Sequence, residues 1–179
     1  MIRKAIIAGF LIAVCATANA AEPKERGFYV GAAGGQSIFD EDGTFGSFGD
    51  DEDKMLQVHA GYKFMKYVAV EARYVDMGSF SIGFDDIEIT ATSIHVIGII
   101  PFGTSGWEVF GQFGVGDVNI DVLGFSSFDE SAGAGGFGVR YYAMQNFSIG
   151  IQTDVYVWEE ASTYDLSVGG TQLSFQFVF

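Results

Sequence analysis

The C-terminal segment Thr171–Phe179 alternates strictly between large apolar side chains and mostly polar ones. Its apolar positions are Leu173, Phe175, Phe177 and Phe179. Because side chains alternate across a strand, this segment has one oily face and one mostly polar face. A sheet in water with such an edge would aggregate, whereas a barrel closed in lipid has no free edge and needs an oily exterior. The segment therefore predicts a transmembrane β-barrel.

The N-terminal segment is typical of a secretory signal peptide. Arg3 and Lys4 precede the apolar run Ala5–Val14, and Ala18-Asn19-Ala20 has the small-x-small pattern of a cleavage site. The apolar run is shorter than the roughly 20 residues that a membrane helix needs. We expect residues 1–20 to be a removed signal peptide and residues 21–179 to form one barrel domain.

The chain is strongly acidic, with 23 Asp and Glu against 9 Lys and Arg and a formal net charge of −14. Phosphate groups would be repelled by such a chain, so we expect no binding of nucleic acid.

Strand-like alternation recurs in eight windows, which predicts an all-β, eight-stranded antiparallel up-and-down barrel. The windows are Gly27–Ser37, Lys54–Met65, Tyr67–Met77, Ile87–Ile100, Gly106–Val118, Ala132–Ala143, Phe147–Trp158 and Asp165–Phe179. We assign uncharged outer faces to the second, the third and the fifth to eighth windows. The orientation of the first window stays open because it is rich in Gly and Ala, and that of the fourth because both faces are apolar.

The connections between these windows alternate in length. Short connections are predicted at 65–67, 101–105 and 144–146, and long ones at 38–53, 78–86, 119–131 and 159–164. Short periplasmic turns and long external loops are typical of outer-membrane barrels, with both termini in the periplasm. Most of the acidic residues lie in or beside the long connections.

A soluble eight-stranded ligand barrel such as a lipocalin would alternate in the same way. Its polar face would meet water and carry many Lys and Glu residues. Here that face is mostly Gly, Ser, Gln and Ala, as expected for a crowded interior. The composition of the polar face therefore favours the membrane barrel.

Four stretches carry a family resemblance: Gly27–Gly31, Val70–Gly78, Phe137–Tyr141 and the terminal Phe179. Through them the chain resembles the small outer-membrane barrels of the OmpA transmembrane-domain and OmpX type. The resemblance implies insertion by the barrel-assembly machinery, which reads a C-terminal aromatic strand. Here that signal is Leu173, Phe175, Phe177 and Phe179.

The predicted inner face carries charges of both signs. Its ionisable and polar residues include His59, Lys63, Glu71, Arg73, Glu108, Arg140, Gln152 and Asp154. A three-residue turn at 65–67 places His59 opposite Arg73, with Glu71 diagonal to both His59 and Lys63. A five-residue turn places Arg140 near Gln152. Buried charges need partners, so we interpret this network as a structural plug, with a gated or leaky pore as the alternative.

One pair of residues resembles a nucleophile and its base. Ser93 and His95 are two apart on one strand and therefore share a face. They fall near the middle of the strand, away from the lipid head groups, so we do not expect an enzyme. The Gly133-x-Gly135-x-x-Gly138 pattern opens a strand instead of a helix, which excludes a dinucleotide site and predicts glycine packing within the barrel.

The acidic first loop is a candidate site for divalent cations. Its carboxylates include Asp40, Asp42, Asp50, Asp51 and Asp53, and carboxylate oxygens suit Ca²⁺ or Mg²⁺. Such ions would bridge the loop to lipopolysaccharide phosphates; the alternative is a solvated, repulsive fringe.

Together these observations predict a monomer in the outer membrane, in contact with its lipids and lipopolysaccharide and without a cofactor. The predicted role is structural and surface-exposed, with acidic loops that contact cations, lipopolysaccharide or external partners. The alternative function is a narrow channel, or a lateral path for hydrophobic solutes.

Overall fold

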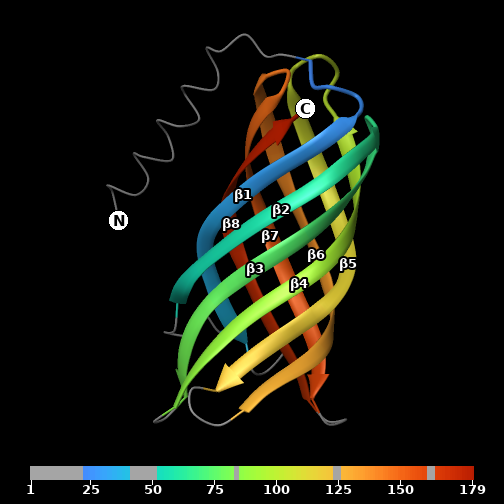
Figure 1. Ribbon diagram of the computed structural model, residues 1–179. Coiled ribbons are helices and arrows are strands. Elements are labelled where there is room, and N and C mark those ends of the chain that lie inside the picture. Colours follow the sequence, from blue (N-terminus) through green and yellow to red (C-terminus); the bar gives the residue numbers. More distant parts are fainter. Residues whose placement is uncertain (1–21, 41–51, 83–84, 123–125, 161–163) are drawn as a thin grey trace, which may run out of the picture.

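The computed structural model describes residues 22–40, 52–82, 85–122, 126–160 and 164–179; the predicted signal peptide lies outside them. Eight antiparallel strands follow one another around a closed barrel, which confirms the predicted fold (Figure 1). The strands are β1 (Gly27–Asp40), β2 (Glu52–Met65), β3 (Val68–Ile82), β4 (Asp85–Pro101), β5 (Trp107–Val122), β6 (Ser126–Met144), β7 (Phe147–Glu160) and β8 (Tyr164–Val178).

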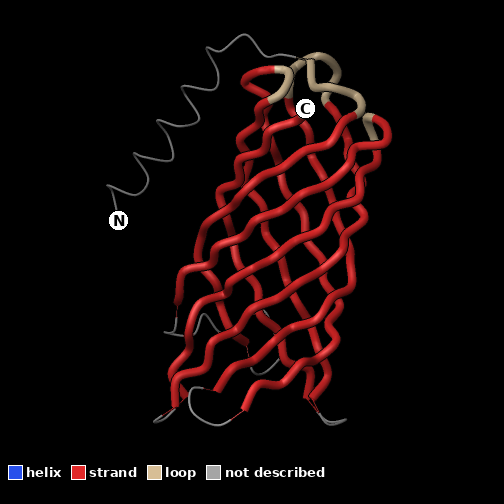
Figure 2. The backbone as a smooth tube through the Cα atoms, viewed as in Figure 1, coloured by secondary structure: helices blue, strands red, loops and turns tan. Residues whose placement is uncertain are grey.

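The barrel closes through β1, which pairs with β2 on one side and with β8 on the other. Tyr29 of β1, for example, lies opposite both Gly61 of β2 and Val178 of β8. The tube in Figure 2 shows this continuous wall of strands. Closure satisfies the backbone hydrogen bonds around the whole circumference, so no sheet edge is left open. In the described part of the chain, no helix has the length and apolar character needed to cross a membrane.

One end of the barrel, which we call the turn end, carries the tight connections and the strand termini Gly27 and Val178. The β4–β5 turn there needs left-handed backbone at Gly103 (φ +58°) and Gly106 (φ +74°), which glycine adopts without strain. The incoming segment reaches across this end, where the Lys24 N–H donates to the Gln145 carbonyl (3.4 Å). We call the opposite end the loop end.

The prediction of a long connection at 78–86 is wrong, because β3 continues past Met77 to Ile82. The pairing of β3 with β4 shifts between Asp76 and Ser79, which marks a β-bulge. Gly78 supplies the required positive φ of +87°, and its N–H donates to Asp76 Oδ1 (3.0 Å). A glycine that resembles the start of a loop in the sequence is therefore a bulge inside a longer strand.

The prediction of a long connection at 119–131 is also wrong. The ladder between β5 and β6 continues to the pair Val122–Ser126, and Asn119 Nδ2 donates to Asp129 Oδ1 across it (2.7 Å). Strands that leave the lipid keep their backbone hydrogen bonds but no longer need an oily face, so the apolar alternation stops before the strand does. β1, β2 and β7 also extend beyond their predicted windows.

The outer surface is apolar over its middle, as the sequence predicts. Phe113, Val115 and Phe137 are among its most exposed side chains. The structure also settles the two open orientations: β1 turns Phe28 outward, and β4 turns Ile94 outward. At the turn end, aromatic rings pair in the manner of an interfacial girdle, as in Trp107–Tyr141 (centroids 4.9 Å apart).

The assignment of uncharged outer faces is wrong at three positions in these windows whose burial is described. Asp76 of β3 and Asp117 of β5 point outward, as does Lys54 of β2. All three lie toward the loop end of their strands. The apolar band therefore ends earlier on this side than the windows suggested, and a polar margin begins there.

Candidate functional site in the barrel interior

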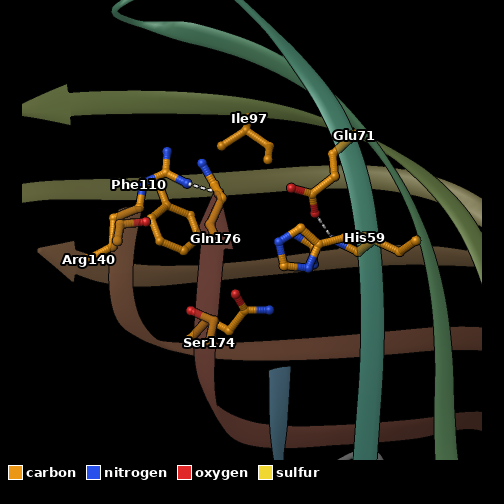
Figure 3. Close-up of a pocket in the computed structure, with 10 residues that line it drawn as sticks. His59, Glu71, Ile97, Phe110, Arg140, Ser174 and Gln176 are labelled. Atoms are coloured by element: carbon orange, nitrogen blue, oxygen red, sulfur yellow. Dashed lines mark hydrogen bonds and ion pairs between the residues drawn. The ribbon is translucent and has the colours of Figure 1, made fainter. Parts of the chain in front are cut away.

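The barrel interior holds two groups of buried ionisable side chains. One is centred on Glu108 and the other on Arg73, and these two side chains are less than 4% exposed. Figure 3 shows Glu71, His59, Arg140 and Gln176 from different strands converging on the same interior space. Alternation explains their placement, because every second residue of each strand faces inward.

Glu108 of β5 is clamped by two cations. Lys63 Nζ donates to its Oε1 (2.8 Å), and Arg140 Nε donates to its Oε2 (2.9 Å). Arg140 also donates through Nη1 to Gln176 Oε1 (2.9 Å) and lies over the ring of Phe110 (4.8 Å). Each charge has a hydrogen-bonded partner, which a buried carboxylate between two cations requires.

Arg73 of β3 contacts side chains of two other strands, β5 and β7, and one of its own strand. It is ion-paired to Glu71 through Nε and to Asp154 through Nη1 (3.1 Å for the latter), and Nη2 donates to Gln112 Oε1. Asp154 also accepts from Gln152 Nε2 (2.7 Å). The guanidinium fork is suited to such a junction, because its donors point in fixed, planar directions.

Glutamines that sequence reasoning did not assign to the network complete it. Gln112 donates to Asp154, and Gln172 Nε2 lies between Asp154 Oδ2 (3.2 Å) and Gln57 Oε1 (3.4 Å). Gln57 in turn lies 3.3 Å from His59 Nδ1. The signal that could have found them is parity: each falls on the inward side of its strand.

The register predicted between β2 and β3 is present, with His59 opposite Arg73. The five-residue turn predicted between β6 and β7 is wrong, because only Gln145 and Asn146 separate the two strands, and Arg140 lies opposite Gly150 and diagonal to Gln152. Glu108 lies opposite Arg140. The side-chain partners differ in two cases. Lys63 bonds across the barrel to Glu108, and Arg140 bonds to Glu108 and Gln176 instead of Gln152. In a narrow barrel, long side chains reach strands that are not neighbours in the ladder, which adjacent-strand reasoning does not see.

Two buried apolar clusters fill the space around this network. Toward the turn end, a buried cluster comprises Tyr29, Ala69, Ile97, Ile99, Phe110, Tyr142 and Val178. Toward the loop end, a second comprises Met55, Val75, Met77, Ile89, Ala91, Val118, Ala132, Ala134, Tyr156 and Val168. The Arg73 group lies between the two clusters, whereas Lys63 and Glu108 lie at the level of the turn-end cluster, where Lys63 Nζ is over the ring of Tyr142 (5.6 Å).

Inward glycines make room for the large inward side chains. A Cβ at Gly61 would lie 2.5 Å from the ring and hydroxyl of Tyr29, and one at Gly114 would lie 2.9 Å from the His95 ring. The cavity lined by His59, Arg140 and Gln176 has a volume of about 10 Å³. That is about the room of a single water molecule. The interior at this level is therefore filled by its own side chains.

Ser93 and His95 are brought together, as their spacing suggested. Ser93 Oγ lies 2.8 Å from His95 Nε2 and 3.2 Å from the Tyr156 hydroxyl. Both side chains are at most 2% exposed, and His95 Nδ1 has no hydrogen-bond partner among the described residues. The pair therefore lacks both an access route and the third group that would orient a catalytic imidazole.

The candidate cation ligands of the first loop fall mostly outside the described residues. Asp42, Asp50 and Asp51 lie there, and only the backbone is described at Asp40 and Asp53. Among the side chains that are described, no three His, Cys, Asp or Glu residues are grouped to hold a metal ion.

The C-terminal aromatic residues lie on the outer surface. Phe175, Phe177 and Phe179 are each at least 40% exposed, and the rings of Phe177 and Phe179 pack edge to face (5.2 Å). Their inward neighbours Ser174 and Gln176 are buried.

Residues 6–179 match the family described as the outer membrane protein beta-barrel domain. The chain belongs to this family. Membership confirms the resemblance to small outer-membrane barrels and indicates the outer membrane as the location. No curated protein sequence matches the chain.

Solved outer-membrane barrels share the fold at low sequence identity. Neisserial surface protein A has a TM-score of 0.71 at 15% identity, with 85% of this chain and 97% of that one covered. OprG of Pseudomonas aeruginosa has a TM-score of 0.55 at 17% identity, covering 89% and 100%. Ail of Yersinia pestis, in complex with the heparin analogue sucrose octasulfate, has 0.55 at 15%, covering 86% and 100%.

Proposed function

We propose that this protein is a structural, surface-exposed component of the outer membrane whose barrel is sealed. The turn end faces the periplasm, and the acidic loop end projects outside and contacts external partners. The observation that carries the proposal is the interior itself, in which ion-paired side chains bridge strands that are not neighbours and two buried apolar clusters fill the space around them.

A sealed interior is what these contacts support. The Lys63–Glu108 and Arg73–Asp154 pairs each join strands that are not neighbours, so they connect the barrel wall across the interior. Opening a water path would require these buried ion pairs and their hydrogen bonds to be broken together. The interior contacts therefore stabilise one closed state of the barrel and hold its strands at a fixed spacing.

The loop end favours cationic partners. Glu88 and Asp121 lie opposite each other at the ends of β4 and β5, and Asp129 and Glu130 are exposed on β6. Ail was crystallised with a polysulfated ligand. A polysulfate would be repelled by these carboxylates, so we expect this chain to select cations, or lipopolysaccharide through bridging cations, instead.

Conductance in planar lipid bilayers tests the sealed barrel. The wild type and an exposed control, Val58→Ala, are expected to show no channels. Glu71→Ala, which removes a partner of Arg73, is expected to give rare openings at most. Regular single-channel currents from the wild type would contradict the proposal.

A narrow channel is the second candidate, and one observation favours it. A cavity of about 320 Å³ opens at the turn end, lined by residues that include Glu25, Lys66, Tyr67 and Pro101. It reaches Ile99 and Glu108, where the Lys63–Glu108–Arg140 bridge begins. A channel would use this bridge as its gate, so wild-type currents that change in ion selectivity in Glu108→Gln would support it.

Three further expectations belong to this proposal. The signal peptide is removed after residue 20, which N-terminal sequencing of the purified protein tests. The barrel functions as a monomer, which its mass in nanodiscs tests. It has no enzymatic activity; a lipase activity of the purified protein that His95→Ala abolishes would overturn this.

A further inference from the structure

A groove lies on the outer surface across β4, β5 and β6, toward the loop end. Its volume is about 570 Å³, within the range of about 300–1,000 Å³ that is typical of small-molecule sites. The outward-facing residues that line it are Thr92, Ile94, Val115, Asp117, Ser131 and Gly133.

The ladder arranges these six residues in two rows. Ile94, Val115 and Gly133 lie side by side across the three strands, because Val115 pairs with both of the others. Thr92, Asp117 and Ser131 form the next row toward the loop end, with Asp117 as the shared partner. The two rows are separated by two residues along each strand, which is about 6.6 Å. The groove thus changes from apolar to polar from one row to the next.

The apolar row is hollowed at Gly133. Val115 is 72% exposed and Ile94 is 60% exposed, so both face the lipid. A Cβ at Gly133 would meet nothing nearer than a backbone oxygen 3.9 Å away. Packing within the chain therefore leaves room for a side chain there, and the room is available to a lipid chain.

The polar row carries an uncompensated negative charge at the margin of the lipid. Asp117 is exposed, and its Oδ1 accepts a long hydrogen bond from Ser131 Oγ (3.4 Å). β4 and β5 contain no Lys or Arg, and the only one in β6 is the buried Arg140 near the other end. Further acids, including Glu88 and Asp121, lie beyond this row. The surroundings of Asp117 therefore attract a cation.

We propose that this groove binds a membrane lipid whose head group carries a primary ammonium. Its acyl chain lies over Ile94, Val115 and Gly133, and its ammonium donates to the Asp117 carboxylate. An ammonium has three N–H donors, so the hydroxyls of Thr92 and Ser131 provide further acceptors. The proposal rests on the placement of the barrel in lipid but not on a sealed interior, so bilayer conductance does not bear on it.

Lipid retention measured by native mass spectrometry tests this site. The protein is placed in phosphatidylcholine nanodiscs that contain a minor fraction of either phosphatidylethanolamine or its N-acetylated form, which lacks the ammonium. We expect one phosphatidylethanolamine per chain to be retained, about tenfold over the N-acetylated lipid, because only the ammonium donates charge-assisted hydrogen bonds to the Asp117 carboxylate.

Three variants locate the site. Asp117→Asn removes the charge and Gly133→Leu fills the hollow, and each is expected to lower retention to the background. Gly98→Leu is the matched control, because Gly98 also faces outward, its Cβ would likewise meet nothing nearer than a backbone oxygen 3.9 Å away, and it does not line the groove. Heat-shifted migration on gels verifies that each variant is folded.

Two results would overturn the proposal. One is equal retention of the two lipids, or retention that Asp117→Asn leaves unchanged. The other is retention that requires Mg²⁺ and is lost in chelator, which would indicate a metal-bridged phosphate in place of an ammonium.

Discussion

The ring of Phe110 lies over Gly138, its direct partner in the β5–β6 ladder. A Cβ at Gly138 would lie 2.5 Å from Phe110 Cζ and 2.6 Å from a backbone oxygen of β7. The contact shows how the interior is filled: a large side chain on one strand occupies the space that a glycine leaves on the next. The same relationship holds for Tyr29 over Gly61.

Gly138→Ala is therefore expected to destabilise the barrel, because overpacking a filled interior typically costs about 1–3 kcal/mol. Gly135→Ala, on the same strand, is the matched control, since a Cβ there would meet only an oxygen 3.8 Å away. The free energy of unfolding in urea, followed by tryptophan fluorescence in lipid vesicles, measures both. Equal effects would show that the interior relaxes around an added methyl group.

These two glycines also show what the sequence predicts and what it does not. Both belong to one Gly-rich pattern, interpreted from the sequence as packing within the barrel. Only Gly138 packs inside, while Gly133 and Gly135 face outward, where a Cβ would meet only a backbone oxygen 3.8–3.9 Å away. The strands, their order and most facing directions follow from a period of two, as at Phe175 and Gln176.

Contacts across the barrel could not be predicted in this way. Lys63 and Glu108 are on β2 and β5, and no ladder register relates them. Their meeting depends on the curvature of the closed wall and on side-chain length. The ends of β3 and β5 were missed for another reason: apolar alternation reports contact with lipid, whereas strand length reports backbone pairing.

Glu108→Gln is expected to destabilise the barrel by about 3–5 kcal/mol, because it leaves the charges of Lys63 and Arg140 without their shared partner. Glu130→Gln, at an exposed position on β6, is expected to change stability by less than about 0.5 kcal/mol. Urea unfolding of the two variants at the same pH gives the comparison. A similar, small effect in both variants would mean that water enters and hydrates the charges of Lys63 and Arg140.

The Arg73–Asp154 pair is expected to be energetically coupled. Arg73→Gln and Asp154→Asn each leave the partner's buried charge unpaired, whereas the double variant removes both charges. The sum of the two single losses should therefore exceed the loss in the double variant, by about 0.5–3 kcal/mol. A double-mutant cycle from urea unfolding measures the coupling. Additive losses would indicate that Gln112 and Glu71 alone hold Arg73.

Positions 58 and 151 are expected to contact lipid. Val58 and Ile151 are each 51% exposed on the outer face of β2 and β7. Cys15 is the only cysteine and lies in the predicted signal peptide, so Val58→Cys and Ile151→Cys each give a single labelling site. Lipid-attached quenchers should quench fluorophores there, and water-soluble quenchers should not. A label at Glu130→Cys, exposed beyond the band, should give the reverse.

Substitution of the terminal Phe179 is expected to impair assembly of the barrel but not its stability. Its ring is 62% exposed and contacts Phe177 on the outer surface, so it adds little to the packing of the interior. If the barrel-assembly machinery reads this aromatic strand, Phe179→Ala should lower the amount of folded protein in the outer membrane several-fold. The same variant, refolded from urea into detergent, should have a free energy of unfolding within about 1 kcal/mol of the wild type, since it lacks only one partly exposed contact.

Phe28→Ala, which changes an exposed aromatic residue of β1 outside the C-terminal strand, is the control and should assemble normally. Loss of both variants from the membrane to the same extent would indicate a general need for aromatic residues at the interface instead of a C-terminal signal.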